Sequence, residues 1–228
     1  PNPDSWYRQQ EALQKKIIAR MRELGIEPVF PGYAGMVPRN IGEKLGYQIA
    51  DPGKWCGFPR LAFLSTEDEH FDSFAAMYYE ELEKLYGKAK YYSMDPFHEG
   101  GNTEGVDLAK AGTSIMGAMK KANPEAVWVM QAWQANPREA MVNTLDSSDL
   151  LVLDLYSEKL PQWGDPESMW YREKGFGKHD WLYCMLLNFG GNVGLHGRME
   201  QLVNGYYNAC AHVNGKTLRG VGATPEGI

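Results

Sequence analysis

The sequence is poor in the residues that build metal centres, disulfide frameworks and membrane spans. It has three cysteines and five histidines in 228 residues, and no apolar run approaches the roughly 18 residues that a membrane span needs. The cysteines form no C-x-x-C pair, and the histidines show no metal-ligand spacing. We therefore expect no metal, no cofactor, no disulfide scaffold and no membrane span.

Clusters of basic residues and nucleotide-binding loops are also missing. The net charge is −6, and the pairs Lys15–Lys16 and Lys120–Lys121 are diluted by acidic neighbours, so no nucleic-acid partner is expected. The segment GGNTEG at 100–105 lacks the Gly-Lys-Ser/Thr of a phosphate loop, and FGGNVGLHG at 189–197 lacks G-x-G-x-x-G spacing. No G-x-S-x-G elbow occurs, and Cys184, inside an apolar run, is interpreted as a buried hydrophobe rather than a nucleophile.

What the chain does contain is a regular alternation of helical and strand patterns. Helices are predicted from Asp4 or Ser5 to about 24, from a capping-box pattern at Thr66 and Glu69 to 86, and over about 104–122, 136–145 and 198–212. Six apolar strands are predicted at 27–33, 90–94, 126–133, 150–156, 181–189 and 218–224. Apolar strands that alternate with helices indicate a parallel sheet covered on both faces.

Two architectures fit this alternation, a doubly wound open sheet and a (β/α)8 TIM-type barrel. The ends of the strands favour the barrel, because a barrel carries its chemistry on the rim formed by the carboxyl ends of its strands. Polar or aromatic residues stand there throughout: Tyr33, Asp95, Gln131, Trp133, Asp154, Tyr156, Asn188 and Glu226. We expect residues 1–228 to form one region of an incomplete barrel with about six βα units, lacking the first units and anything downstream.

Residues 34–64 form a long connection with few periodic features. Connections of this length inside a compact domain are often functional loops. This one carries Trp55 and Cys56 between glycines, in PGKWCGF. It is expected to be either an active-site loop or a cover over the outside of the barrel.

Two carboxylates follow strands in similar surroundings. Glu99 lies in DPFHEGG and Glu226 in ATPEGI, and each stands just beyond a proline and directly before a glycine. Two carboxyl groups about 5–5.5 Å apart, one acting as acid and one as nucleophile, are what glycoside cleavage with retention requires. Strand ends of a barrel rim can bring such a pair together.

The sequence resembles glycoside hydrolase family 89, the α-N-acetylglucosaminidases, over nearly its whole length. The matching stretches are the tryptophan of the long loop, DPFHEGG (95–101), EAVWVMQAW (125–133), LLVLDLYSE (150–158), WLYCMLLNFGGNVGLHG (181–197) and GVGATPEGI (220–228). The resemblance implies a catalytic TIM barrel and hydrolysis of glycans that end in α-linked N-acetylglucosamine. It also implies that the rest of the same polypeptide contributes to the pocket, and it suggests a secreted, periplasmic, cell-surface or lysosomal protein.

The resemblance also implies roles for individual residues. Glu99 corresponds to the general acid/base and Glu226 to the nucleophile. The implied substrate-binding residues are Trp55, His98, Trp133, Asn188 and Phe189. Some members of the family carry asparagine where this chain has His98, so we expect the contact with the sugar's substituents to differ there.

The chemistry of the substrate agrees with two protein carboxylates. In an α-linked N-acetylglucosaminide the 2-acetamido group lies on the same side of the ring as the leaving oxygen, so it cannot attack from behind. The enzyme must then supply its own nucleophile. Two alternatives remain: a non-catalytic carbohydrate-binding barrel, and a sugar-phosphate aldolase or lyase. The aldolase or lyase would need a strand-end lysine or a metal cluster, and no predicted strand ends on lysine.

Overall fold

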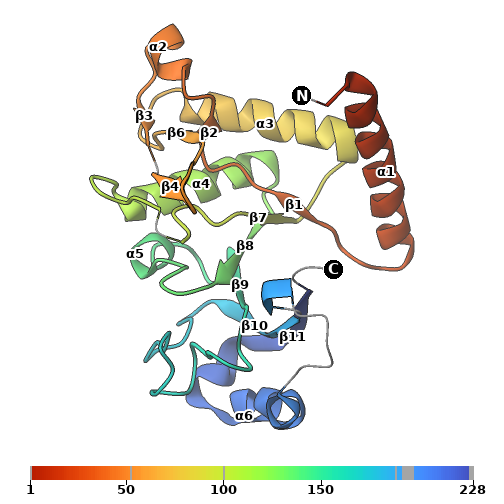
Figure 1. Ribbon diagram of the computed structural model, residues 1–228, viewed down its shortest axis with the longest axis vertical. Coiled ribbons are helices and arrows are strands. Elements are labelled where there is room, and N and C mark those ends of the chain that lie inside the picture. Colours follow the sequence, from red (N-terminus) through yellow and green to blue (C-terminus); the bar gives the residue numbers. More distant parts are fainter. Residues whose placement is uncertain (1, 52, 100, 188, 192–197, 226–228) are drawn as a thin grey trace.

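The computed structural model describes residues 2–51, 53–99, 101–187, 189–191 and 198–225, and its centre is a six-stranded parallel sheet (Figure 1). The strands are β1 (Val29–Pro31), β7 (Tyr91–Ser93), β8 (Val127–Ala132), β9 (Leu150–Asp154), β10 (Asp180–Leu187) and β11 (Leu218–Pro225). Their order in space is their order in the chain, and every neighbouring pair is parallel. A doubly wound sheet reverses its strand order part-way, whereas a barrel adds each strand on the same side. The predicted incomplete barrel is confirmed.

The core lies between this sheet and the helices that precede or follow its strands. The helices include α1 (Asp4–Glu23), α3 (Phe71–Tyr86), α4 (Leu108–Ala122), α5 (Glu139–Val142) and α6 (Tyr206–Ala211). Strands whose residues are apolar at successive positions bury both faces, and Trp128 and Trp181 are fully buried. Helix α4 was predicted to begin at about 104 and begins at Leu108, where Asp107 caps it by accepting a hydrogen bond from the backbone N–H of Lys110 at 3.1 Å.

Helix α1 has the predicted extent, but the prediction of its buried face was wrong. The pattern placed Leu13, Ile17, Met21 and Leu24 on the inner face, and the structure buries only Ile18 among the residues of this helix. Leu13, Ile17 and Leu24 are exposed. Periodicity identifies the apolar side of a helix, but it does not say which residues on that side pack against the rest of the protein.

The start of α3 also differs from the prediction. The helix begins at Phe71, and no side chain caps it. Instead of a capping box at Thr66 and Glu69, the Asp68 carboxylate accepts hydrogen bonds from the backbone N–H groups of His70 and Gln48, at 2.8 and 2.9 Å. A long-range contact to the preceding connection therefore takes the place of the local cap.

Two further helices are less regular than predicted. The helix predicted over 136–145 is reduced to the four residues of α5. The helix predicted over 198–212 contains a π turn at Gln201–Gly205 before α6. A side chain at Gly205 would collide with the hydroxyl of Tyr183, so the helix meets the sheet at close range here.

The connection between β1 and α3 is more structured than its composition indicated. It holds β2 (Met36–Val37), α2 (Ile41–Leu45), β3 (Ile49–Ala50), β4 (Lys54–Trp55), β5 (Phe58–Pro59) and β6 (Ala62–Leu64). These strands form two small antiparallel sheets, in the orders β2-β6-β3 and β4-β5. The β4–β5 hairpin brings Trp55 to the turn beyond β7, where its indole Nε1–H bonds the Glu99 carboxylate.

The two outer strands of the main sheet leave its edges open. Within the described ranges, β1 pairs only with β7, and β11 pairs only with β10. Apolar side chains stay exposed on elements beside these edges: Trp6, Tyr7, Leu13 and Ile17 on α1, and Leu202, Val203, Tyr207 and Val221 near β11. None of the described helices is long and apolar enough to cross a membrane.

Candidate active site

Glu99 lies in a tight turn, 96–99, that two residues separate from the end of β7. Phe97 and Glu99 both adopt left-handed backbone conformations, with φ of 61° and 46°. Gly101 is required where the turn closes, because a Cβ there would lie 2.6 Å from the Cα of Phe97. Non-glycine residues in this region of φ are strained, and such strain gathers at functional sites where the surroundings hold it in place.

The 34–64 connection holds Glu99 from the other side of the turn. The indole Nε1–H of Trp55 donates a hydrogen bond to Glu99 Oε2 at 2.6 Å. The Nη2–H of Arg60 donates to the backbone carbonyl of Glu99, also at 2.6 Å. One bond therefore orients the carboxylate and the other fixes its strained peptide, and both come from residues about forty positions earlier in the chain.

His98 stands beside Glu99 and is half-buried. Burial lowers the pKa of its imidazole, and the negative charge of Glu99 opposes that change. Its buried Nε2 has no hydrogen-bond partner within the described ranges. A buried polar atom without a partner is the kind of group that a bound ligand satisfies. The neutral imidazole is therefore available to a polar substituent of a substrate.

Asp95 ties the Glu99 turn to the end of β8. Its Oδ1 accepts hydrogen bonds from the backbone N–H of Gln131 at 2.9 Å and from the Nδ2 of Asn136 at 2.8 Å. Trp133 and Asn136 in turn exchange backbone hydrogen bonds of 3.2 and 2.9 Å. Burial raises the pKa of Asp95 to about 6, although the hydrogen bonds that its carboxylate accepts from Gln131 and Asn136 oppose the rise. Asp95, Phe97, His98 and Glu99, together with Trp55 and Arg60, form what we call the acid wall.

Four aromatic rings form a second wall, called the aromatic wall, at the ends of β8, β9 and β10. The Trp133 ring stacks on Tyr156 with centroids 6.2 Å apart and meets the edge of Trp170 at 4.6 Å. Phe189 lies 5.7 Å from Trp133 and 5.3 Å from Tyr156. The buried Nε1 of Trp133 has no hydrogen-bond partner among the described residues. Aromatic faces with a spare N–H suit a sugar, which is apolar at its C–H groups and polar at its hydroxyls.

The acid at the end of β9 is structural rather than part of the open rim. Asp154 is fully buried, and its Oδ2 accepts a hydrogen bond from the Ser157 hydroxyl at 2.6 Å. Burial raises the pKa of its carboxyl to about 7. The Asp154 side chain therefore holds in place the start of the connection that follows β9, and this connection contains Tyr156 and Trp170.

The structure describes five of the seven residues assigned to the site from the sequence. Glu226 and Asn188 lie outside the described residues. Trp55, His98 and Glu99 meet on the acid wall, while Trp133 and Phe189 meet on the aromatic wall. Among the described residues no group of three or more His, Cys, Asp or Glu side chains is placed to hold a metal ion.

Asp95 and Phe97 of the acid wall were not assigned to the site from the sequence, and neither were three further contributors. Tyr156 was recognised only as a strand-end residue. Arg60 and Trp170 lie in connections without periodic pattern, where no local signal distinguishes them. Their roles follow from contacts with Glu99 and Trp133 that only the fold creates.

Comparison with known proteins identifies the family. The family model described as the alpha-N-acetylglucosaminidase (NAGLU) tim-barrel domain matches residues 1–228, which is the entire chain. The chain belongs to this family. Human alpha-N-acetylglucosaminidase is 33% identical over the full chain, which covers 32% of the human protein.

Solved structures of family 89 match this chain over part of their own length. The family 89 glycoside hydrolase of Clostridium perfringens, bound to 2-acetamido-1,2-dideoxynojirmycin, matches with a TM-score of 0.88 and 37% identity. A variant of the C. perfringens protein with two Glu-to-Gln substitutions, in complex with its substrate GlcNAc-alpha-1,4-galactose, matches with a TM-score of 0.89 and 36% identity. Both matches cover 100% of this chain and 26% of the bacterial one. The chain spans about a third of the human relative and about a quarter of the bacterial one.

Proposed function

We propose that the protein containing this chain is an exo-acting, retaining α-N-acetylglucosaminidase that removes terminal α-linked N-acetylglucosamine from glycans. The observation that carries the proposal is the presentation of Glu99 on the carboxyl rim of a NAGLU-family barrel. Its carboxylate is oriented by the Trp55 indole at 2.6 Å and its peptide is fixed by Arg60. A carboxylate fixed in this way can transfer a proton to a substrate in the space that it faces.

Glu99 is proposed to act as acid and then as base. It protonates the leaving glycosidic oxygen as the bond to the anomeric carbon breaks. In the second step it removes a proton from the incoming water, which attacks the same carbon from the face that the leaving group vacated. Glu99 is only part-buried, and its side chain is oriented by Trp55. The carboxyl group can therefore face the substrate and still exchange its proton with solvent.

Glu226 is proposed as the nucleophile, which forms a β-glycosyl ester with the sugar. Supporting this, Glu226 directly follows Pro225, the last residue of β11, and Pro225 pairs with Leu187 of β10 in the parallel sheet. The carboxyl ends of parallel strands meet on one rim, and β8, β9 and β10 separate β7 from β11. Closure of the barrel would then set the two carboxylates across its mouth. The relative captured with its substrate after two Glu-to-Gln substitutions agrees with a mechanism that needs two glutamates.

The remaining site residues are proposed to bind the terminal sugar. Trp133 and Phe189 offer ring faces, and Trp133 adds an indole N–H that has no hydrogen-bond partner in the part of the chain that the structure describes. His98 offers its unsatisfied Nε2 to a polar substituent. We propose that Asn188 joins them from its position just before Phe189.

The rest of the polypeptide is proposed to complete the site. Six strands with two open edges need further βα units to close an eight-stranded barrel, and the exposed apolar residues of α1 give those units a surface to cover. Residues 34–64 would serve as an active-site loop, since Trp55 and Arg60 contact Glu99. The experiments below therefore use the full-length protein.

Rescue by azide tests both catalytic assignments in one design. Glu226→Ala should lose turnover of an α-N-acetylglucosaminide that has an activated leaving group, and azide should restore it by attacking from the vacated face to give the β-glycosyl azide. Glu99→Ala should still form the glycosyl-enzyme from such a substrate, and azide should then give the α-glycosyl azide. NMR of the anomeric proton distinguishes the two products.

Glu104→Ala is the matched control, because it removes an exposed carboxylate five residues beyond Glu99. It should hydrolyse the substrate at the unmodified rate and form no azide adduct. Failure of azide to rescue a folded Glu226→Ala protein, or α-azide from that variant, would refute the nucleophile assignment. Equal losses for natural and activated substrates in Glu99→Ala would refute acid catalysis by Glu99.

A further inference from the structure

The last residues of β10 extend beyond the strand that lies beside them. Residues 180–183 of β10 pair with residues 151–154 of β9, where β9 ends. β10 continues to Leu187, and among the described strands its residues 184–187 pair only with β11. A strand edge without a neighbour has backbone N–H and C=O groups that need other partners.

Two residues of the connection that follows β9 supply such partners. The backbone N–H of Ser157 donates a hydrogen bond to the carbonyl of Cys184 at 3.1 Å. The backbone N–H of Leu186 donates to Glu158 Oε1, also at 3.1 Å. The first bond is of the kind that neighbouring strands exchange. In the second, a side-chain carboxylate takes the place that a backbone carbonyl of a longer β9 would have.

Leu186 lies at the base of the aromatic wall. Its side chain is buried in one cluster with Tyr156, and Trp133 packs against that cluster. Phe189 follows three residues later in the chain, and its ring centroid lies 5.3 Å from Tyr156 and 5.7 Å from Trp133. The position of Leu186 therefore affects how the end of β10 presents Phe189 to the space beside these rings.

The same end of β10 also supports the end of β11. Leu186 pairs with Thr224, and Leu187 pairs with Pro225. Pro225 directly precedes Glu226, the proposed nucleophile. A shift of the end of β10 would therefore be passed on to the residue from which the nucleophile follows.

The bond to Leu186 needs an acceptor at the position of Glu158 Oε1 but does not need a charge. Burial raises the pKa of Glu158, although the hydrogen bond from Leu186 opposes the rise. Glu158 Oε2 is buried and has no hydrogen-bond partner in the ranges that the structure describes. An amide oxygen has the same lone pairs as Oε1, so glutamine can accept this bond as well.

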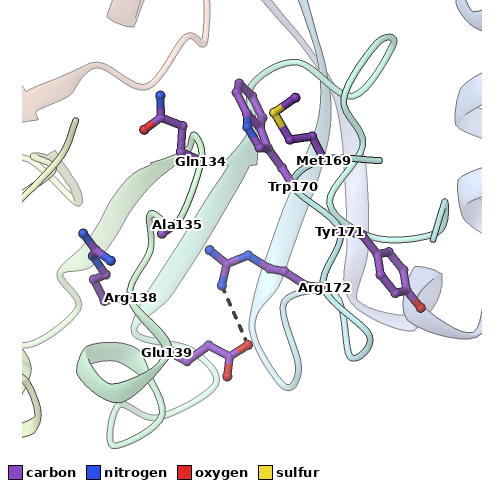
Figure 2. Close-up of a pocket in the computed structure, with 8 residues that line it drawn as sticks. All are labelled: Gln134, Ala135, Arg138, Glu139, Met169, Trp170, Tyr171 and Arg172. Carbon is purple, nitrogen blue, oxygen red and sulfur yellow. Dashed lines mark ion pairs between the residues drawn. The ribbon is translucent and has the colours of Figure 1, made fainter. Parts of the chain in front are cut away.

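The far end of the connection that contains Glu158 is held by other contacts. The Nε–H of Arg172 donates to Gln162 Oε1 at 2.6 Å, and its Nη1 lies 3.8 Å from a carboxylate oxygen of Glu139. Figure 2 shows this ion pair, with Trp170 on the same stretch of the connection. Loss of the bond from Glu158 should therefore move the end of β10 and leave Trp170 in place.

We propose that Glu158 is a positioning residue, whose side-chain acceptor replaces the missing strand beside Leu186 and so fixes the end of β10. The inference rests on the proposed exo-glycosidase function and adds a residue to it. Glu158 acts through Leu186 on Phe189 and, through β11, on Glu226, and it does not touch the substrate. Its length and its acceptor oxygen matter, whereas its charge does not.

Two variants of the full-length protein separate these properties. Glu158→Gln keeps the length and the acceptor oxygen and removes the charge. Glu158→Asp keeps the charge and withdraws the acceptor by one methylene group. For each variant kcat/KM is measured with GlcNAc-α-1,4-galactose, whose leaving oxygen needs a proton, and with N-acetyl-α-glucosaminyl fluoride, whose leaving group does not. Thermal unfolding verifies that the assays are made on folded protein.

We expect Glu158→Asp to lower kcat/KM about tenfold, the effect of losing one hydrogen bond. The loss should be the same for both substrates, because both need the terminal sugar and the nucleophile in position. Glu158→Gln should keep the activity and the pH profile of the unmodified protein. Glu167→Asp is the matched control, since it makes the same change at an exposed carboxylate of the same connection, and it should be silent.

Unchanged kinetics in Glu158→Asp would overturn the positioning role while the proposed function stands. So would a folded Glu158→Gln protein that loses activity or one limb of its pH profile, because the charge would then matter. A loss confined to the disaccharide would place Glu158 with the departing group and overturn the role as well. If Glu158→Asp does not fold, Glu158→Gln decides by the same criteria. Failure of the unmodified protein to hydrolyse either substrate overturns the proposed function, and the positioning role with it.

Discussion

The two walls of the candidate site are built by different physical means. The acid wall depends on single hydrogen bonds and a strained turn, with Trp55 and Arg60 each making one bond of 2.6 Å to Glu99. The aromatic wall depends on ring packing, with centroid distances between 4.6 and 6.2 Å. A group that exchanges protons must stay accessible to solvent. A surface that stacks against a sugar ring binds it more tightly when the surface is apolar and rigid.

This difference predicts how a substitution in each wall changes turnover, substrate binding and stability. Loss of one hydrogen bond on the acid wall should lower turnover and leave the fold intact. Loss of one ring on the aromatic wall should weaken both substrate binding and the packing of its neighbours. The three predictions that follow test this contrast in the full-length protein, from the largest expected effect to the smallest.

Trp133→Ala should produce the largest change, because Trp133 touches the other three rings of the aromatic wall. Removing a packed tryptophan lowers the free energy of unfolding by about 3 kcal/mol or more. The loss of the stacking face should also raise KM for GlcNAc-α-1,4-galactose at least tenfold. Thermal unfolding and steady-state kinetics measure the two effects.

Trp6→Ala is the control for this variant, since Trp6 lies on α1 and its ring contact is with Tyr7. It should leave KM unchanged. A Trp133→Ala protein whose KM is unchanged while kcat falls would show that Trp133 is not a binding surface.

Asp95→Asn should change how stability depends on pH. Burial raises the Asp95 pKa from 3.8 to about 6, so the folded state holds this proton more tightly than the unfolded state does. The wild-type protein therefore loses stability from this group as pH rises from about 4 to about 6, by roughly 3 kcal/mol in all. Asparagine keeps the Oδ1 acceptor and does not titrate. The melting temperature of the variant relative to wild type should rise across this window.

Asp107→Asn gives a control of opposite sign. Hydrogen bonding by the Lys110 backbone N–H lowers the Asp107 pKa, so this carboxylate stabilises the fold above its ordinary pKa and stops doing so as pH falls. Relative to wild type, its variant should lose stability as pH rises through the ordinary titration range of an aspartate, because the carboxylate of the wild type then becomes charged and stabilises the fold. Parallel pH curves for Asp95→Asn and wild type would show that burial of Asp95 does not set its proton affinity.

Trp55→Phe should produce the smallest change, because it removes one hydrogen bond to Glu99 and keeps an aromatic ring. We expect kcat for GlcNAc-α-1,4-galactose to fall roughly three- to tenfold, within the value of one charge-assisted bond, and KM to change less. Phe58→Leu alters the residue paired with Trp55 across the β4–β5 hairpin without touching that bond, and should be nearly silent. A fall confined to KM would place Trp55 in binding rather than in orienting the acid.

Sequence reasoning worked best where one local pattern decides the outcome. The six strands were predicted because buried parallel strands must be apolar along their whole length, as in 150–154 and 181–187. Glu99 was singled out because a proline and two glycines mark the exit from a strand. The buried face of α1 and the length of α5 were predicted less well, since neighbouring elements decide both.

The sequence by itself determined that this chain is a parallel βα structure with chemistry-bearing residues at its strand ends, because periodicity and turn residues act over a few positions. Only the tertiary structure decided that Trp55 holds the carboxylate of Glu99 across 44 positions, and that Asp95 links the Glu99 turn to the segment that presents Trp133. It also decided that Asp154 is buried while Glu99 stays accessible. These outcomes depend on which elements pack together, and packing joins residues whose spacing in the chain carries no signal.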